Sequence, residues 1–227
     1  MIKEELKALY LGRRLSMAES AKELGTTHAT VLYWLKKHGI KRRSWSESTY
    51  LKLNPEGNPF DIPDELSPRQ RELLIVGPLL FWTEGNKGQP AVRLANLDPR
   101  MLRLFLMFLR EVCHVRENRV HLYVRVHRQF ALAPAQRYWT RQLRVAASQV
   151  HVYRHTDARS KAEKQWSPDG LATLQVHSSK LKVWLDREIE TYLRALLGPL
   201  PARVSELLEH KQLLLNGKRL HGPYRKV

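Results

Sequence analysis

A stretch rich in helix-breaking residues divides this chain. Residues 54–64 read Asn-Pro-Glu-Gly-Asn-Pro-Phe-Asp-Ile-Pro-Asp. Proline lacks a backbone N–H and clashes with the preceding helical turn, so no helix is expected to continue through this stretch. We therefore expect a first domain over residues 1–53, a linker over 54–66 and a second domain over 67–200. Residues 201–227 are expected to form a last helix, over 204–215, and a basic tail.

The balance of charge indicates the kind of partner. The chain has 39 Lys and Arg against 22 Asp and Glu, a formal net charge of +17, which favours a polyanion. No membrane-spanning helix is expected, because Gly77, Pro78 and Glu84 interrupt the longest apolar run, and a spanning helix needs roughly 20 apolar residues. We recognise no signal peptide, and the single Cys113 excludes an internal disulfide framework. We expect a cytoplasmic, nucleoid-associated protein.

The first domain has the pattern of three short helices. Ser16 and Glu19 form a capping box at the start of the second helix, Gly25 supplies a tight turn, and Thr26 or Thr27 caps the third helix. The apolar positions expected to face inward are Leu6, Leu9, Tyr10, Ala18, Ala21, Leu24, Val31, Leu32 and Leu35. This order predicts a helix-turn-helix module.

In such a module the third helix enters the major groove of DNA. The residues near its start that are expected to reach base edges are Thr27, His28, Thr30 and Tyr33. The basic residues expected to contact phosphates are Lys36, Lys37, Lys41, Arg42 and Arg43. The segment resembles the helix-turn-helix modules of resolvases and transposon regulators, which implies DNA binding. A small three-helix bundle used for protein contact is the alternative, and the basic run favours DNA.

The second domain alternates between helical and strand periods, which predicts an α+β fold. A capping box at Ser67 and Gln70 begins the first helix, and Asp98 followed by Pro99 begins the second. The expected helices cover 67–85, 98–112, 134–143 and 180–197, and the expected strands cover 92–94, 119–128, 149–153 and 173–177. We interpret the helix over 67–85 as buried.

Three of these strands alternate between apolar residues and a face of polar and aromatic residues. Val120, Leu122, Val124 and Val126 are expected to face the core. The opposite face is expected to bind nucleic acid through Arg119, His121, Tyr123, Arg125, His127, Gln149, His151, Tyr153, Gln175 and His177. An ordinary solvated face would carry Glu as often as Arg, yet no acid occurs here. RNA or a membrane surface is the alternative partner.

The helix over 67–85 resembles the signature helix of the LAGLIDADG family. It ends on Glu84 followed by Gly85, and an Asn-Leu-Asp-Pro element over 96–99 opens the next apolar helix. The resemblance covers about 67–197. It implies a curved antiparallel sheet backed by helices and laid in the DNA major groove. A single copy implies a homodimer, in which Glu84 would serve as the catalytic acid and the ligand of Mg²⁺.

Departures from the family pattern bear on cleavage. The signature helices of the family pair closely through small residues, whereas this chain has Pro78, Leu79, Trp82 and Thr83 near the end of its helix. Some members of this fold, such as sporulation regulators of the WhiA type, have lost cleavage. The sequence therefore predicts a sequence-specific, regulatory binder of double-stranded DNA. The alternative is a Mg²⁺-dependent homing-type DNA endonuclease.

Other motifs carry less weight. His151 and His155 have the spacing of zinc ligands on a helix, but their segment is predicted to be a strand and a loop. Cys113 and His114 are adjacent, and adjacent side chains seldom face each other, so we interpret Cys113 as a core residue. The aromatic side chains Trp139, Trp166 and Trp184 are expected to pack in the core.

Overall fold

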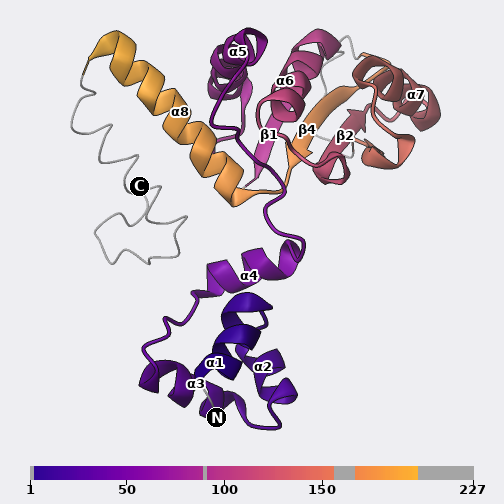
Figure 1. The fold of residues 1–227 in the computed structure, drawn as a ribbon. Helices are drawn as coiled ribbons and strands as arrows, with labels where there is room; N and C mark the ends of the chain where they lie inside the picture. Colours follow the sequence, from indigo (N-terminus) through magenta and orange to yellow (C-terminus); the bar gives the residue numbers. More distant parts are fainter. Residues whose placement is uncertain (1–2, 89–90, 156–166, 199–227) are drawn as a thin grey trace, which may run out of the picture. The chain divides into compact units, whose positions relative to one another are not determined.

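The chain forms two compact units, and their boundary lies between Gly57 and Asn58. A computed structural model describes residues 3–88, 91–155 and 167–198 (Figure 1). The predicted helix over 204–215 and the basic tail lie outside the described residues, as does Trp166. In the described part of the chain, no helix is both long and apolar enough to cross a membrane.

The first unit is helical. It contains α1 (Lys3–Lys7) with a π-helical turn over Ala8–Gly12, α2 (Met17–Glu23), α3 (His28–Lys37) and α4 (Trp45–Leu53). Its buried core consists of Leu6, Tyr10, Ala21, Val31 and Leu35. Ala18 was expected in this core but is exposed, and Met17, the first residue of α2, packs there instead.

Helix α4 was not predicted. Ser44 begins it with a full capping box, in which the Ser44 hydroxyl accepts from the Glu47 N–H at 3.1 Å. None of its described side chains is fully buried, and Trp45 is 84% exposed. The helix therefore has a start signal but no apolar face, and apolar periodicity is the signal on which our prediction of helices relied.

The proline-rich stretch belongs in part to the second unit. Phe60, Ile62 and Leu66 pack against the core of that unit. The Asp61 N–H donates to the Cys113 carbonyl at 3.0 Å, and the Arg116 N–H donates to the Pro59 carbonyl at 2.9 Å. From residue 58 onward the stretch is thus held in place by apolar packing and backbone hydrogen bonds.

The second unit combines helices with one sheet, which confirms the α+β class. Its helices are α5 (Pro68–Glu84), α6 (Pro99–Glu111), α7 (Leu132–Leu143) and α8 (Ser179–Leu197). Its strands are β1 (Val92–Asn96), β2 (Val120–Val126), β3 (Val150–Arg154) and β4 (Leu171–Val176). The strand order in the sheet is β1-β4-β2-β3.

The sheet is mixed, so the expectation of an antiparallel sheet was wrong. Strand β4 runs antiparallel to both of its neighbours, but β2 and β3 are parallel, with Tyr123 opposite His151. The connection between β2 and β3 contains α7, which contacts both strands. Helix α7 carries the chain from the end of β2 back to the end of the sheet at which β2 begins, so that β3 can run parallel to β2.

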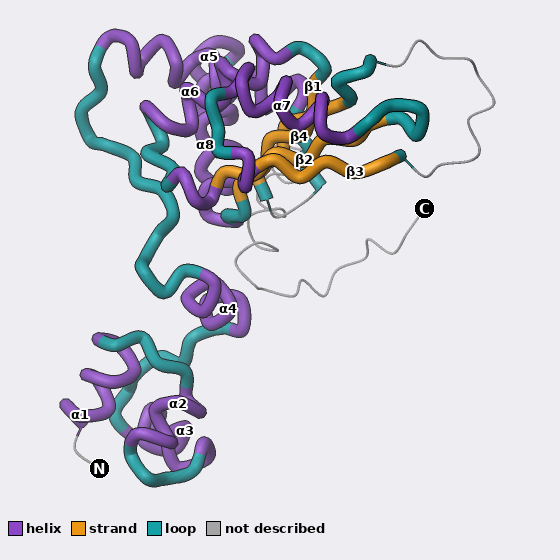
Figure 2. Tube along the Cα trace, turned by 90° about the vertical axis from the view of Figure 1, so that its right-hand side faces the viewer, coloured by secondary structure: helices purple, strands orange, loops and turns teal. Residues whose placement is uncertain are grey.

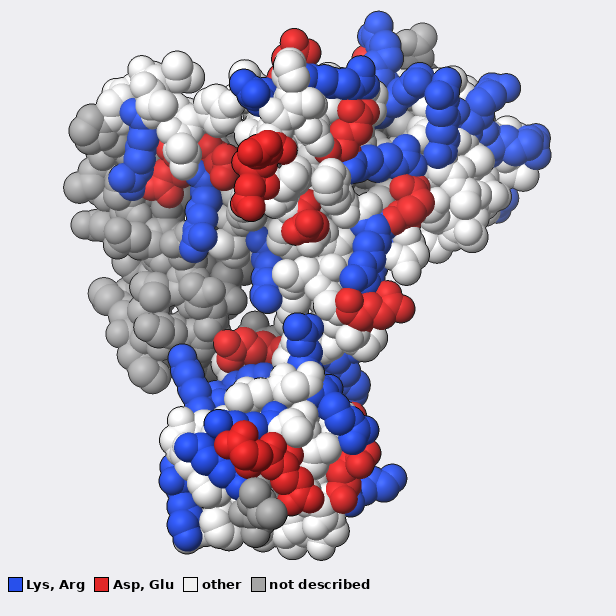
Figure 3. Space-filling view, in the orientation of Figure 1, with Lys and Arg blue, Asp and Glu red and all other residues white. Residues whose placement is uncertain are grey.

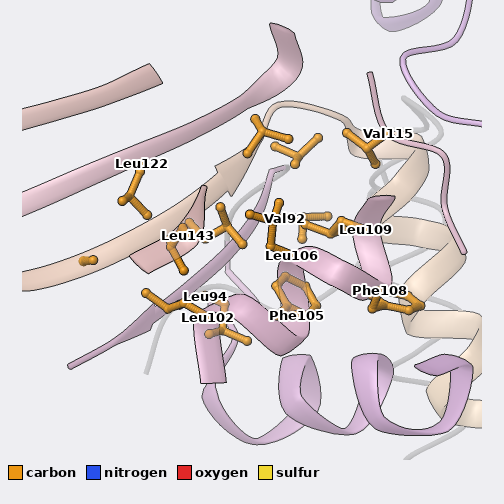
Figure 4. Close-up of a cluster of buried hydrophobic side chains, with 14 of the residues drawn as sticks. Val92, Leu94, Leu102, Phe105, Leu106, Phe108, Leu109, Val115, Leu122 and Leu143 are labelled. Carbon is orange, nitrogen blue, oxygen red and sulfur yellow. The ribbon is translucent and has the colours of Figure 1, made fainter. Parts of the chain in front are cut away.

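The core of the second unit lies between the sheet and its helices. Figure 2 shows α5, α6 and α7 on one side of the strands. The four apolar residues of β2 that were expected to face the core are fully buried, as are Trp139 and Cys113. Figure 4 shows Leu106 and Leu109 of α6 beside Val92 of β1. The other face of the sheet carries mostly polar and aromatic side chains, together with Ala95 and Leu171.

Helix α5 is buried on one side only, so the expectation of a fully buried helix was wrong. Leu73, Gly77, Pro78 and Phe81 are buried. On the opposite side, Ile75, Leu79 and Trp82 are 44%, 42% and 40% exposed. Their spacing of four and three residues places them in one apolar stripe along the helix.

Candidate nucleic-acid interface

The open face of the sheet carries basic and aromatic side chains without acids. His121, Tyr123 and Arg125 of β2 alternate with the buried valines and leucine of that strand. His151 and Tyr153 occupy the same face of β3. None of the four described strands contains an Asp or Glu. On the side of the molecule drawn in Figure 3, by contrast, acidic and basic side chains are interspersed.

Histidines cluster on this face. The rings of His121 and His151 are stacked with centroids 5.7 Å apart, and the Nε2 of His151 lies 3.5 Å from the Nδ1 of His121. The ring of His177, which follows β4, lies 6.2 Å from that of His121. The Tyr123 ring stacks on His151 at 5.1 Å. The register of β3, β2 and β4 therefore brings three histidines together.

A shallow hollow of about 390 Å³ adjoins the histidine cluster. It is lined by Arg93, Tyr123, Tyr153, Thr173, Gln175 and His177. Arg93 comes from β1, where it lies opposite Gln175 of β4. Among the described residues, the Arg93 Nε is buried without a hydrogen-bond partner. The hollow thus combines a guanidinium, hydroxyls and ring nitrogens, which are groups that bind phosphates and base edges.

Burial and, to a smaller extent, neighbouring charges lower the pKa of two of these histidines. Burial lowers the pKa of His121, and the neighbouring His151, His177 and Arg119 lower it further. Burial also lowers the pKa of His177, with a further contribution from Arg93. Both effects disfavour the charged imidazolium in the free protein.

Several predicted contact residues do not lie on an exposed strand face. Arg119 and Gln149 lie in 3₁₀ turns that precede β2 and β3, rather than in the strands. The Gln149 amide donates to the backbone carbonyls of Glu117 at 2.8 Å and Val120 at 3.1 Å, so it joins the two turns. His127 directly follows β2.

Gln175 was expected to be exposed, and this was wrong, since it is only 4% exposed. Its side-chain amide donates to the His177 ring. Strand β4 lies between β1 and β2, and Gln175 has the long side chains of Arg93 and His121 as its cross-strand neighbours. Gln175 is therefore suited to orient His177.

The start of α3 carries the second group of predicted contacts. The Thr27 hydroxyl accepts from the Thr30 N–H at 3.2 Å and lies 2.9 Å from the Thr30 hydroxyl. Tyr33 is 57% exposed, and the Lys37 ammonium lies 4.6 Å from the ring centroid of Trp34. His28, Lys36, Lys41 and Arg42 are also exposed.

Arg43 was predicted to contact phosphate but is half-buried within the first unit. Its guanidinium stacks on the Tyr10 ring at 4.0 Å and donates to the carbonyl of Arg14 at 3.1 Å and to that of Leu15. Its backbone N–H donates to the Tyr10 hydroxyl at 2.9 Å. These contacts assign Arg43 a role in fixing the segment between α3 and α4.

Comparisons with protein-family models, curated proteins and solved structures found no match.

Glu84, the predicted catalytic and metal-binding residue, is exposed at the last position of α5. The described residues contain no group of three or more His, Cys, Asp or Glu side chains that could hold a metal ion. The Cys113 thiol is buried, and burial raises its pKa well above the ordinary value, so it is a poor nucleophile.

Sequence reasoning missed two residues of the hollow, Arg93 and Thr173. A signal for Arg93 was present, because Val92 and Leu94 were recognised as a short strand and the residue between them must face the other way. Thr173 is the first residue of the strand expected over 173–177 and lies opposite Tyr123, but it was not among the expected contacts.

Proposed function

We propose that this protein binds double-stranded DNA in a sequence-specific manner and acts as a regulator. The observation that carries the proposal is the open sheet face, on which arginine, histidine and tyrosine side chains are grouped without an acid. A β-sheet surface of this kind can contact phosphates and base edges in a groove. The formal net charge of +17 adds attraction that does not depend on sequence.

The first unit supports the same proposal. Helices α2 and α3 are joined by a short turn in which Gly25 has φ +59°, and Thr27 caps α3. We assign α3 as the recognition helix of a helix-turn-helix, with His28 and Tyr33 directed at base edges. Lys36, which is exposed in the last turn of α3, is assigned to phosphate.

The endonuclease alternative depends on Glu84 and a divalent cation. The residues of one chain do not fit a Mg²⁺ site, because Glu84 belongs to no described group of three or more ligating side chains. The exposed stripe on α5 favours pairing with a second copy of the chain, which would bring a second Glu84 toward the first. Cleavage by such a pair would show as Mg²⁺-dependent cuts in the experiment that follows.

The proposal is tested with full-length protein and a randomised duplex library, with Mg²⁺ or with EDTA. Retained and cut molecules are both sequenced. Enrichment of an uncut motif is the expected result. Discrete cuts that require Mg²⁺ and disappear in Glu84→Gln would support the endonuclease instead. Equal retention of all sequences, or preference for single-stranded RNA, would contradict sequence-specific duplex binding.

Arg125 provides a matched test of the sheet face. It is exposed on β2, whereas Arg103 is exposed on α6, so Arg125→Gln and Arg103→Gln remove the same charge from different faces. We expect Arg125→Gln to weaken duplex binding and to reduce the slope of log affinity against log salt by about one. Arg103→Gln should behave like the wild type. Equal effects of the two variants would remove the sheet from the interface.

A further inference from the structure

Three imidazoles from different parts of the sheet meet at one point of the proposed interface. His121 comes from the start of the interior strand β2, His151 from the edge strand β3, and His177 is the residue after β4. The two ring nitrogens of His121 and His151 that face each other are 3.5 Å apart. One of these two rings can donate to the other only while the other is neutral.

The groups around the cluster are positive or uncharged. Arg93 faces His177, and Arg119 lies close enough to His121 to act on it electrostatically. Tyr123 and Gln175 supply uncharged contacts from β2 and β4. No carboxylate comes from any of the described strands. Among the described residues, the charged groups that act on His121 and His177 are all basic, so a proton added to either ring in the free protein meets repulsion from its neighbours.

A phosphodiester bound to this surface would supply the negative charge that favours protonated histidines. Its anionic oxygens accept hydrogen bonds from imidazolium and offset the repulsion between neighbouring cations. The exposed rings of His151 and His177 are accessible to such a group, and the Arg93 Nε is an unused donor among the described residues. His121 and His177 would thus hold protons poorly in the free protein and well in the complex.

We propose that His121, His151 and His177 form a proton-linked phosphodiester site, at which binding of the nucleic acid backbone is accompanied by uptake of protons. This inference rests on the proposed function and adds the regulation of the sheet surface by pH. The lowered pKa values of His121 and His177 in the free protein agree with it.

The sign and size of the effect follow from linkage between binding and protonation. Between the pKa of a histidine in the free protein and its higher value in the complex, binding takes up a proton, so affinity rises as the pH falls. Each proton taken up changes the dissociation constant by up to about tenfold per pH unit within that interval. We expect binding about tenfold tighter at pH 5.5 than at pH 7.5.

The experiment measures binding of full-length protein to a rhodamine-labelled duplex between pH 5.5 and pH 8.0 at constant ionic strength. His121→Gln and His177→Gln are compared with His114→Asn. His114 is exposed after α6 at φ +42°, a backbone conformation that asparagine tolerates. We expect the cluster variants to lose at least half of the pH dependence and the His114 variant to keep it.

Calorimetry of the wild-type protein in buffers of different ionisation enthalpy counts the protons directly and needs no variant. Net uptake at pH 6.5, reduced in His177→Gln, would support the site. A pH dependence unchanged in both cluster variants, or one abolished by His28→Gln on α3, would overturn it. No duplex binding at any pH would instead overturn the proposed function, whereas binding without proton uptake would overturn only this inference.

Discussion

At the scale of single residues, Gly77 sets how closely α5 approaches α6. A Cβ added at Gly77 would lie 2.1 Å from the Cγ of Phe108. Phe108 is fully buried and contacts the rings of Phe105 and Trp184, so it has no room to move away. Alanine favours a helix by roughly 1 kcal/mol over glycine, but overpacking of this kind costs about 1–3 kcal/mol.

A 2.1 Å approach belongs at the severe end of that range, about 3 kcal/mol, so we expect Gly77→Ala to lower the free energy of unfolding of the second unit by about 2 kcal/mol after the gain in helix propensity. Chemical denaturation followed by circular dichroism measures this. Gly88→Ala is the control, because a Cβ there would meet only the Asn86 side chain at 3.7 Å. Equal stability of Gly77→Ala and wild type would contradict the close packing of α5 on α6.

Burial of individual side chains was predictable where apolar and polar residues alternate along a strand. It was not predictable where contacts with distant residues determine it. The alternation in β2 identified Val120 and Tyr123 as members of opposite faces, as observed. Gln175 obeys the same alternation yet is buried, because its strand lies between two others and neighbours cover it. Similarly, nothing local marks Arg43 as a residue that stacks on Tyr10, which lies 33 positions earlier.

At the scale of elements, substitution of Thr27 tests whether its hydroxyl caps α3 or contacts DNA. It accepts from the Thr30 N–H, which is the bond an N-cap side chain provides. We expect Thr27→Ala to destabilise the first unit by about 1 kcal/mol. Thr27→Ser retains the hydroxyl and should be close to wild type in thermal unfolding. If Thr27→Ala unfolds like wild type but binds duplex DNA less tightly, Thr27 is a contact rather than a cap.

The positions of strands and helices in the second unit were largely predictable, but the direction of pairing was not. Period-two alternation located β2, β3 and β4, and capping signals at Ser67 and Asp98 located α5 and α6. The parallel pairing of β2 with β3 depends on how α7 packs across both strands. The helix between the two strands was itself predicted, and a strand–helix–strand order favours parallel neighbours. The antiparallel expectation came from the family resemblance instead.

At the scale of the whole molecule, the candidate interface depends on contacts far apart in the sequence. The strand order brings Arg93 and His177 to one hollow, although 84 positions separate them (177 − 93). Sequence patterns could assign each residue to a face but not to a neighbour, because the order of strands is fixed by packing between distant segments. The histidine cluster was therefore visible only as three separate histidines.

The exposed apolar stripe of Ile75, Leu79 and Trp82 on α5 bears on the oligomeric state of the protein. Exposed apolar side chains on one helix face favour burial against a partner, and a second copy presents the same stripe. We expect sedimentation equilibrium to give about twice the mass of the 26.6 kDa chain. In a two-fold interface Leu79→Lys places two charges at the contact, so we expect this variant to have the mass of one chain.

Leu97→Lys is the matched control for this measurement. Leu97 is 58% exposed in the loop before α6 and is separate from the stripe. It should retain the mass of the wild type, which would show that one added lysine does not by itself dissociate the dimer. A wild-type protein of single-chain mass, or dissociation by both variants alike, would exclude α5 as the dimer contact. If both copies of such a dimer bind one duplex, the DNA site should contain two related half-sites.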